Sequence, residues 1–493
     1  MAKESLHGKR VTVAGLGRFG GGIAAARWLV EQDAKVLVVD GEPAEKLAES
    51  VVKLAGLPIE FHLGAEDERD FTSTDLVVTS PALPPAHPCL AAARRAAIPV
   101  TTEIALFIER CPTKLTVGVT GTKGKSTTTA LLARMLNAAS PAGRHANWNP
   151  QTSRARPKGN SKESPHPAPA FFSDVGAAHR VFLGGNIGTS LLDQLPNITS
   201  NDIVVLELSS YMLHYLGLMR WSPHVAVVTM VGADHVEWHG SPESYLEAKQ
   251  NIVRYQTEKD FAVVSTDSPA SRAFGKLTKG TVIEYGKRAN LPAAFAPALV
   301  GRHNRINERG AFATARLFGV YADEAAEQVK DFRGLPHRLE LVHEASDIRW
   351  YNDSIATIPE AAIAANNAFE PGKVIQIVGG YDKHLDMAAM CTALASRCKA
   401  VLTIGALGPT LAQKCRDAKP RAAIVECDTL ERAVEHARTI ATPDDVVLLS
   451  TGCASYDQFA NFEVRGARFG ELREADRQRI WHRRVQTTAS HPM

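Results

Sequence analysis

Residues 120–127, with the sequence Thr-Gly-Thr-Lys-Gly-Lys-Ser-Thr, are the clearest candidates for chemistry in this chain. An apolar run that predicts a buried strand precedes them, and a run that predicts a helix begins near Ser126. A glycine turn between a strand and a helix directs backbone N–H groups and the positive helix end at one point, which suits a polyphosphate. Lys125 adds a charge for the outer phosphates, and the Ser126 hydroxyl suits the accompanying Mg²⁺. The predicted ATP-binding residues of this turn are Gly121, Thr122, Lys123, Gly124, Lys125, Ser126 and Thr127.

The match to the P-loop pattern is imperfect at one position. The usual spacing places a glycine where this chain has Val119. A glycine-rich turn with an incidental lysine is therefore the alternative for this stretch taken alone.

A second glycine loop lies near the N-terminus, with the sequence Gly-Leu-Gly-Arg-Phe-Gly over residues 15–20. It follows a predicted strand, and Asp40 ends the next predicted strand. This is the dinucleotide-binding fingerprint, in which glycines admit a pyrophosphate and an acid reaches a ribose hydroxyl. The stiff turn from Ser80 to Leu83 follows a further strand, at the sheet edge where such folds bind ligands. The pattern predicts a nucleotide-like ligand, and the alternative is a turn that only packs a strand on a helix.

Two later features could complete a nucleotide site. Glu207 ends an apolar strand that follows the P-loop, where such folds place a carboxylate that organises Mg²⁺; the alternative is a helix cap. Asn304 and Asn307 are three residues apart on a predicted helix and so share one face. Paired amides there could recognise an adenine edge, or they could cap the helix.

The elements that must position these residues repeat as strand, turn and helix along the chain. This pattern predicts an α/β fold with parallel sheets covered on both faces. We expect three domains, over residues 1–112, 113–333 and 334–493. Residues 140–180 are rich in Pro, Ser, Asn, Arg and His and poor in aliphatic residues, which predicts a long surface insertion in the second domain.

Composition limits the classes of function. The 493 residues contain 45% hydrophobic and 22% charged residues, and the formal net charge is only +3, so neither nucleic acid nor an anionic membrane is required as a partner. No apolar run is long enough to predict a membrane span. Seven scattered cysteines without a CxxC pair indicate reduced thiols. We expect a cytoplasmic protein, and a monomer.

The order of these motifs resembles the Mur ligases, the ATP-dependent amide-forming enzymes of peptidoglycan precursor synthesis. Besides the P-loop stretch, the resemblance rests on the segments 185–188, 207–210, 234–235, 248–249, 303–307 and 335–338. Within the family, residues 352–354, 379–383 and 454–462 look most like the members that add glutamate. The match covers almost the whole chain.

The resemblance implies a Rossmann-like N-terminal domain, a central P-loop ATPase-type domain and a Rossmann-like C-terminal domain. It also implies a reaction: ATP phosphorylates the carboxylate of UDP-N-acetylmuramoyl-L-alanine, and the amine of D-glutamate then displaces phosphate. Two Mg²⁺ sites are expected. Lys249 is expected to carry a CO₂-derived carbamate, because an ammonium cannot bind a metal whereas a carbamate oxygen can.

The resemblance further assigns roles to individual residues. The catalytic residues it implies are Lys125, Glu207, His235 and Lys249, and the metal-binding residues are Ser126, Glu207, His235 and carbamylated Lys249. ATP would also meet Asn304, Asn307, Arg338 and Asp353. The UDP substrate would meet Gly15, Leu16, Gly17, Asp40, Ser80, Leu83 and Asn186. Glutamate would meet Thr357, Lys383, Ser455 and Phe462.

Three departures from the family pattern keep alternatives open. Ile355 stands where the usual member has a lysine, so L-glutamate remains an alternative substrate. Residues 234–239 replace a more usual acid and arginine arrangement, and the 140–180 insertion is longer than the family needs. The more distant alternatives are a folate-polyglutamylating relative, an NAD-dependent oxidoreductase that uses only the first glycine loop, and a nucleotide-binding scaffold without activity.

Overall fold

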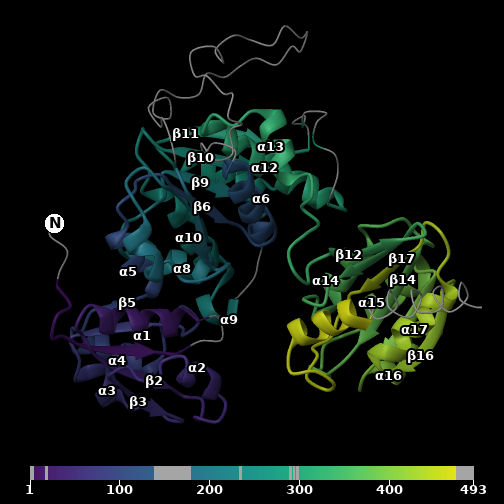
Figure 1. Ribbon diagram of the computed structural model, residues 1–493, viewed down its shortest axis with the longest axis horizontal. Coiled ribbons are helices and arrows are strands. Elements are labelled where there is room, and N and C mark those ends of the chain that lie inside the picture. Colours follow the sequence, from purple (N-terminus) through teal and green to yellow (C-terminus); the bar gives the residue numbers. More distant parts are fainter. Residues whose placement is uncertain are drawn as a thin grey trace, which may run out of the picture. The chain divides into compact units, whose positions relative to one another are not determined.

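A computed structural model describes residues 5–16, 20–137, 179–232, 236–287, 291, 295 and 299–472. These residues contain three β-sheets with helices against both faces of each (Figure 1). The chain divides into two compact units, one comprising Met1–Ala296 with Ile306–Lys330 and the other Pro297–Arg305 with Asp331–Met493. The first unit holds the N-terminal and central sheets, and the second holds the C-terminal sheet.

The N-terminal sheet is parallel and has the strand order β3-β2-β1-β4-β5. Its strands are β1 (Arg10–Ala14), β2 (Lys35–Asp40), β3 (Ile59–Leu63), β4 (Leu76–Thr79) and β5 (Val100–Thr101). Its helices are α1 (Gly21–Glu31), α2 (Ala48–Val52), α3 (Glu68–Thr72), α4 (Pro88–Arg95) and α5 (Glu103–Arg110). Apolar residues of α1 and α5 pack on one face, and those of α3 and α4 pack on the other. The strand order reverses at β1, which is where such sheets bind ligands.

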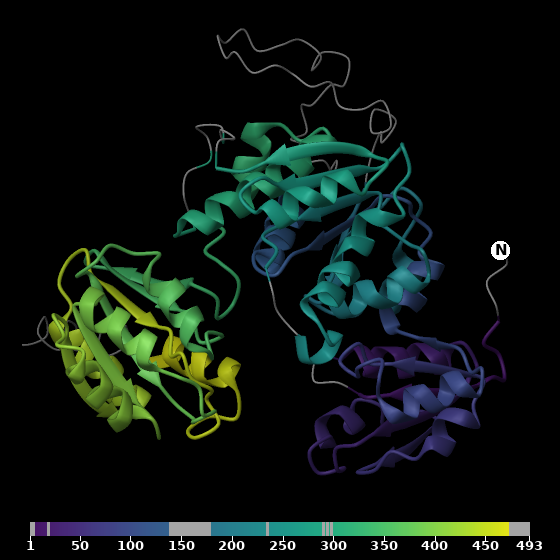
Figure 2. The same ribbon diagram turned by 180° about the vertical axis from the view of Figure 1, so that it is seen from behind.

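The central sheet is also parallel, with the order β11-β10-β9-β6-β8-β7 (Figure 2). Its strands are β6 (Thr116–Thr120), β7 (Val181–Gly185), β8 (Ile203–Glu207), β9 (Val225–Val228), β10 (Phe261–Ser265) and β11 (Thr281–Tyr285). The helices are α6 (Lys125–Asn137), α8 (Ser210–Leu218), α9 (Val236–His239), α10 (Pro242–Arg254), α11 (Pro269–Ala273), α12 (Arg302–Leu317) and α13 (Ala322–Val329), with short 3₁₀ turns η1 (Leu192–Asn197) and η2 (Phe274–Lys276). Every residue of β6 and β8 is buried, as expected of inner parallel strands covered on both faces.

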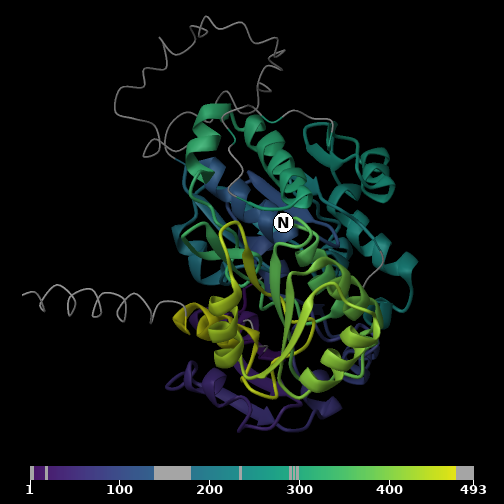
Figure 3. The same ribbon diagram turned by 90° about the vertical axis from the view of Figure 1, so that its right-hand side faces the viewer.

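The C-terminal sheet has the order β12-β13-β17-β14-β15-β16 (Figure 3). Its strands are β12 (Glu340–Ala345), β13 (Ile348–Asn352), β14 (Val374–Gly379), β15 (Ala400–Ile404), β16 (Ala423–Asp428) and β17 (Val446–Leu449). The helices are α14 (Pro359–Asn366), α15 (Ala388–Arg397), α16 (Gly408–Asp417), α17 (Leu430–Ile440) and a last helix over residues 462–472. Helices α14 to α16 cover one face, and α17 and the last helix cover the other.

The prediction of wholly parallel sheets is wrong at one edge. Strand β12 runs antiparallel to β13. Ser346 and Asp347 join them with φ angles of 52° and 58°, the left-handed pair of a tight hairpin turn. A two-residue turn leaves no chain for a crossover, so the two strands must run in opposite directions.

Other predictions can also be compared with the described residues. The predicted strands near residues 10–14, 35–39, 203–206 and 446–449 are all present. All seven cysteines are free thiols. Within the described residues no helix has the length and apolarity needed to cross a membrane. Of the predicted insertion, residues 140–178 lie outside the described residues; His179 and Arg180 already lead into β7.

Candidate active site

The P-loop segment joins the end of β6 to the start of α6. Thr122 and Lys123 donate their backbone N–H groups to the Met230 carbonyl at 2.7 and 3.2 Å. The Thr122 hydroxyl lies 2.8 Å from the hydroxyl of Tyr245. The Nζ atom of Lys125 donates to the Thr122 carbonyl at 3.1 Å. The loop is therefore held in one shape at the positive end of α6, as an anion site requires.

At two positions of this loop only glycine fits, because a Cβ atom would clash with a neighbouring side chain. Gly121 has a φ of 151°, and a Cβ there would lie 2.0 Å from Oγ1 of Thr229. Gly124 has a φ of 91°, and a Cβ there would lie 2.4 Å from Oδ1 of Asn307. The structure thus brings the Asn307 amide against the P-loop. Asn304 instead donates from Nδ2 to the carbonyl four residues earlier, at 2.8 Å.

Glu207 lies beside the P-loop because β8 pairs with β6. The register sets Glu207 opposite Val119, and its side chain is 1% exposed. Asn186 donates from Nδ2 to Oε1 of Glu207 at 3.0 Å. The other oxygen, Oε2, is buried and has no hydrogen-bond partner among the described residues. A buried carboxylate oxygen without a partner is costly, and a divalent hard cation would satisfy it, so the residues present fit Mg²⁺.

Lys249 of α10 also reaches the P-loop. Its side chain is only 2% exposed, although a lysine on a helix is ordinarily solvated. Its Nζ atom donates to the Gly121 carbonyl at 2.9 Å and lies 3.5 Å from Oγ1 of Thr120. The ammonium also lies 4.8 Å from the ring centroid of Tyr245. The P-loop backbone therefore fixes the position of this amine.

The first glycine loop, Asp40 and the Ser80 turn lie together at the carboxyl edge of the N-terminal sheet. The Leu16 N–H donates to Oδ2 of Asp40 at 3.0 Å, and the backbone N–H two residues after Asp40 donates to Oδ1 at 3.0 Å. A Cβ on Gly15 would lie 3.0 Å from Cβ of Ser80 and 3.3 Å from Cδ1 of Leu83. The Asp40 carboxylate therefore holds the backbone of the glycine loop in place through these hydrogen bonds, whether or not it also contacts a ligand.

Trp238 of α9 links the central sheet's helices to that turn, a role that the sequence did not predict. Its indole Nε1–H donates to the carbonyl of Ala82 at 3.1 Å. Its ring centroid lies 4.6 Å from that of Tyr211 and 4.5 Å from that of His239. The only sequence signal was an aromatic residue three positions after the Asp-His pair of residues 234–235.

In the C-terminal unit, Asp353 follows β13 and is 6% exposed. Its Oδ2 accepts a hydrogen bond from Oγ of Ser450 at 2.7 Å, and its Oδ1 accepts the Leu339 N–H at 3.1 Å. Burial raises the pKa of Asp353 to about 7, against the opposing effects of these hydrogen bonds and of the nearby Arg338. Arg338 itself is exposed. The carboxyl group thus joins three segments at the carboxyl edge of the sheet.

The loops after β14 and β17 meet at the same edge. The Tyr381 N–H donates to the Ala454 carbonyl at 2.9 Å. Gly380, with a φ of 140°, would place a Cβ 2.1 Å from that oxygen. Ser455 comes next along the chain and is 2% exposed, whereas Lys383 is exposed.

The remaining residues predicted for glutamate are Thr357, in the loop after β13, and Phe462, at the start of the last helix. Thr357 and Phe462 are both half-buried. The Phe462 carbonyl accepts a hydrogen bond from Oγ of Ser354 at 2.8 Å. Ile355, the position of the family lysine, is half-buried, and its N–H donates to the His337 carbonyl at 3.2 Å. The four predicted residues therefore lie at one edge of the C-terminal sheet, three of them on loops and Phe462 at the start of the last helix.

Three protein-family models match the chain in order. The Mur ligase MurD-like N-terminal domain matches residues 9–102, the Mur ligase middle domain matches residues 119–300, and the Mur ligase glutamate ligase domain matches residues 337–453. The chain belongs to the Mur ligase family. Its three sheets are the three domains of a Mur ligase, as the motif order predicted.

Full-length relatives of this Mur ligase share about a third of its residues. It is 36% identical over 502 residues to the UDP-N-acetylmuramoylalanine–D-glutamate ligase of Roseiflexus sp. (strain RS-1), covering 95% of this chain and 99% of the relative. It is 33% identical over 491 residues to the enzyme of the same name from Symbiobacterium thermophilum, covering 95% and 98%. Among solved structures, the UDP-N-acetylmuramate-alanine ligase of Thermotoga maritima superposes with a TM-score of 0.55 at 19% identity, covering 95% and 100%.

A few predicted site residues cannot be placed. Gly17, Asp234 and His235 lie outside the described residues of this Mur ligase. The remaining P-loop residues, Ser126 and Thr127, begin α6; Thr127 is 7% exposed and Ser126 is half-buried.

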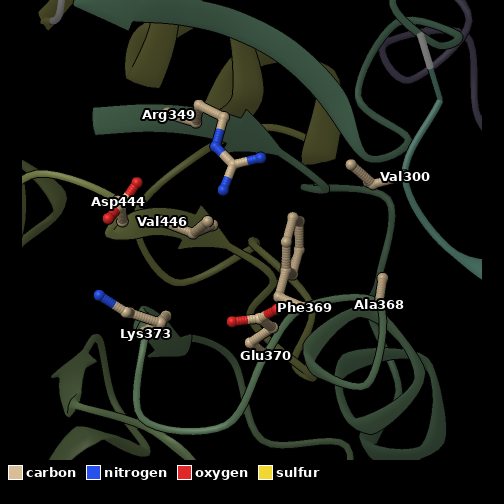
Figure 4. Close-up of a pocket in the computed structure, with 8 residues that line it drawn as sticks. All are labelled: Val300, Arg349, Ala368, Phe369, Glu370, Lys373, Asp444 and Val446. Atoms are coloured by element: carbon tan, nitrogen blue, oxygen red, sulfur yellow. The ribbon is translucent and has the colours of Figure 1, made fainter. Parts of the chain in front are cut away.

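A pocket of about 400 Å³ in the C-terminal unit lies away from the predicted residues (Figure 4). Arg349, Lys373 and Val446 line it at the amino-terminal starts of β13, β14 and β17. Asp353 and Ser455 follow the opposite, carboxyl ends of those strands. In parallel sheets the carboxyl ends carry the ligand site, so we assign this pocket no role in the Mur ligase reaction.

The N-terminal domain of this Mur ligase contains one more group with metal-binding residue types, namely Glu66, His87 and Cys89. Oε2 of Glu66 lies 2.9 Å from Nε2 of His87, which is a hydrogen-bond distance. Burial and nearby acids raise the pKa of the Cys89 thiol, which disfavours the thiolate form. We assign no metal to this group.

Proposed function

We propose that this Mur ligase uses ATP to join D-glutamate to UDP-N-acetylmuramoyl-L-alanine, forming an amide with release of ADP and phosphate. Its full-length relatives bear the name of that activity. The observation that carries the proposal is Glu207: a buried carboxylate, oriented by Asn186 and paired in register with Val119 of the P-loop strand. This arrangement suits phosphoryl transfer and leaves no role for a redox cofactor.

The ATP end of the reaction uses the P-loop. The N–H groups at the start of α6 and the charge of Lys125 would bind the β- and γ-phosphates and stabilise the charge that moves between them. Asn307, which touches Gly124, lies where it could also meet the nucleotide. Transfer of the γ-phosphoryl group to the substrate carboxylate gives an acyl phosphate, whose phosphate is a good leaving group. The amine of glutamate then attacks the carbonyl carbon, loses a proton, and displaces phosphate.

Ser126 and Glu207 would hold one Mg²⁺, which would neutralise phosphate charge during transfer. We propose that Lys249, with His235, serves a second metal site after reaction with CO₂. In that reaction the ammonium first loses a proton, the Nζ lone pair of the neutral amine then bonds to the carbon of CO₂, a second N–H proton leaves, and an anionic carbamate results. One N–H remains, so the hydrogen bond to the Gly121 carbonyl can persist.

The carbamate has a direct test. Protein equilibrated with ¹³C-labelled bicarbonate should give a carbamate carbon resonance that the Lys249→Met variant lacks. Lys259→Met, at an exposed position of the same domain, is the matched control and should keep the signal. A spectrum that is unchanged in Lys249→Met would exclude the modification at this residue.

For the UDP substrate, the turn from Ser80 to Leu83 with the first glycine loop would bind the UDP group, and Asn186 would meet the muramoyl-alanine part.

Glutamate carries two carboxylates and needs two separated anion contacts. We assign these contacts to Lys383 and Ser455, with Thr357 and the Phe462 backbone beside them. We assign Arg338 and Asp353 of the C-terminal domain to ATP binding as well. We further propose that the enzyme acts as a cytoplasmic monomer.

The same chemistry with L-glutamate remains the second candidate, because Ile355 replaces the family lysine. Purified protein should release phosphate from ATP when given Mg²⁺, UDP-N-acetylmuramoyl-L-alanine and D-glutamate, and much less with L-glutamate. The reverse preference would establish the second candidate. No phosphate release with either enantiomer would reject both.

A further inference from the structure

Arg465 is the largest fully buried side chain among the described residues, with 1% of its surface exposed. It lies on the last helix, residues 462–472, and points into the C-terminal domain. Its Nε donates to Oγ of Ser354 at 2.9 Å, and its Nη2 donates to the carbonyl of the same residue at 2.9 Å. Its Nη1 donates to the Cys453 carbonyl at 3.1 Å.

All three acceptors of Arg465 are neutral. Among the described residues no carboxylate forms an ion pair with it, and Asp457 acts on it only through space. Burial lowers the pKa of Arg465 to about 10, so it still carries its charge at neutral pH. A buried charge that only neutral groups contact is expensive, and natural proteins bury arginine in this way chiefly where an anion offsets the charge.

The guanidinium lies beneath the loops that we assign to glutamate. Ser354 precedes Ile355 and Thr357, and its Oγ also donates to the Phe462 carbonyl. Cys453 lies two residues before Ser455. A Cβ on Gly380, in the loop that leads to Lys383, would lie 3.3 Å from Nη1. The Arg465 guanidinium therefore contacts the loop of Ser354 and the loop of Cys453, and it lies close to the loop of Gly380.

We propose that Arg465 is a positioning residue for the glutamate substrate: it fixes the three loops and supplies the positive potential that Ile355, in place of the family lysine, does not. The anion that offsets its charge is a carboxylate of glutamate. The inference rests on the proposed function, since it concerns the same site.

Two substitutions separate charge from geometry. Arg465→Lys keeps the charge but cannot donate to all three acceptors in the planar pattern of a guanidinium. Arg465→Gln keeps hydrogen bonding and removes the charge. The matched control is Arg468→Gln, one turn along the same helix, where the arginine is exposed and paired with Glu431 and Glu471.

Steady-state kinetics should then be measured with each substrate varied. We expect Arg465→Gln to raise the KM for glutamate by about tenfold or more, the size of a lost charge-assisted interaction, and to leave the KM for ATP within about twofold. Arg465→Lys should raise the KM for glutamate less, and Arg468→Gln should match the wild type. Adding Ile355→Lys to Arg465→Gln should lower the KM for glutamate again, because a cation returns to the loop that Arg465 supports.

The result that overturns the proposal is an unchanged KM for glutamate in Arg465→Gln, or equal changes in the KM for both substrates with no effect of Ile355→Lys, which would indicate a purely structural arginine. If the Arg465 variants do not fold, Ser354→Ala removes the Oγ that accepts from Nε of Arg465 and donates to the Phe462 carbonyl. It should then raise the KM for glutamate by about threefold, and an unchanged value overturns the proposal. A wild type inactive with both glutamate enantiomers would instead reject the proposed function.

Discussion

Asn186 and Glu207 form a hydrogen-bonded pair in which only one carboxylate oxygen is used. Nδ2 of Asn186 lies 3.0 Å from Oε1 of Glu207, while the buried Oε2 has no hydrogen-bond partner among the described residues. The amide therefore fixes the orientation of the carboxylate and leaves one oxygen for a ligand. This division of roles is common where a neighbouring residue orients a metal ligand.

Replacing Glu207 by Gln should lower ATP-dependent phosphate release by about 100-fold or more, because the charge that would meet Mg²⁺ is lost. Asn186→Ala should cost about tenfold, since the carboxylate remains but is no longer oriented. Asn197→Ala, at an exposed position of the turn η1, is the control and should match the wild type. Titration of Mg²⁺ in the same assay should show a higher requirement for Asn186→Ala. Full activity in Glu207→Gln would contradict the assignment.

Gly124→Ala should abolish ATP binding. The added methyl group would lie 2.4 Å from Oδ1 of Asn307, and the residue would keep a φ of 91° at a cost of about 1–2 kcal/mol. Gly319→Ala is the matched control, because its φ is 77° and nothing lies within 4 Å of the added carbon. Calorimetric titration with ATP should detect no binding to Gly124→Ala and normal binding to Gly319→Ala. Equal affinities would show that contact with Asn307 does not matter.

Glu103 should make the stability of the first unit depend on pH. Burial and the nearby Asp193 raise its pKa from 4.5 to about 7, although Ser190 donates a hydrogen bond to it. Between these values the folded state holds a proton that the unfolded state has released, so the contribution of Glu103 to stability is greatest below about pH 4.5 and falls as the pH rises towards 7.

Glu103→Gln removes this titration, so the variant should gain stability relative to the wild type as the pH rises from 5 to 8. The expected gain is on the order of 1–3 kcal/mol, measured by urea unfolding at each pH. Glu109→Gln, at an exposed position on the same helix, should show no such trend. The raised pKa of Asp353 is common to all three proteins and cancels in the comparison. Parallel curves for wild type and Glu103→Gln would disprove the prediction.

Trp238→Phe should weaken binding of the UDP substrate. Phenylalanine keeps most of the aromatic contact with Tyr211 but cannot donate to the Ala82 carbonyl, so the turn beside the proposed UDP site loses one anchor. We expect a rise of about three- to tenfold in the KM for that substrate, equivalent to one hydrogen bond, and no change in the KM for ATP. Trp221→Phe, a partly buried indole elsewhere in the same unit, is the control. An unchanged KM for the UDP substrate in Trp238→Phe would show that the hydrogen bond from Trp238 to the Ala82 carbonyl does not contribute to binding.

Local pattern was sufficient to predict most of the fold. Apolar runs predicted β6, β8 and β17, because a strand buried on both faces needs continuous apolar residues. The hairpin between β12 and β13 was missed. Ser346 and Asp347 are not the asparagine-glycine type of turn that announces a reversal, although the backbone there adopts the same left-handed conformation.

The sequence by itself predicted the local segments that carry the candidate residues, above all the strand, glycine turn and helix start that form the P-loop around Lys125. Only the tertiary structure decided which distant residues support them: Asn307 against Gly124, the Trp238 indole on Ala82, and Arg465 on Ser354, 111 residues away. The reason is physical. A turn depends on the φ and ψ preferences of a few adjacent residues, whereas a contact between distant segments depends on strand order and helix packing, which no local pattern specifies.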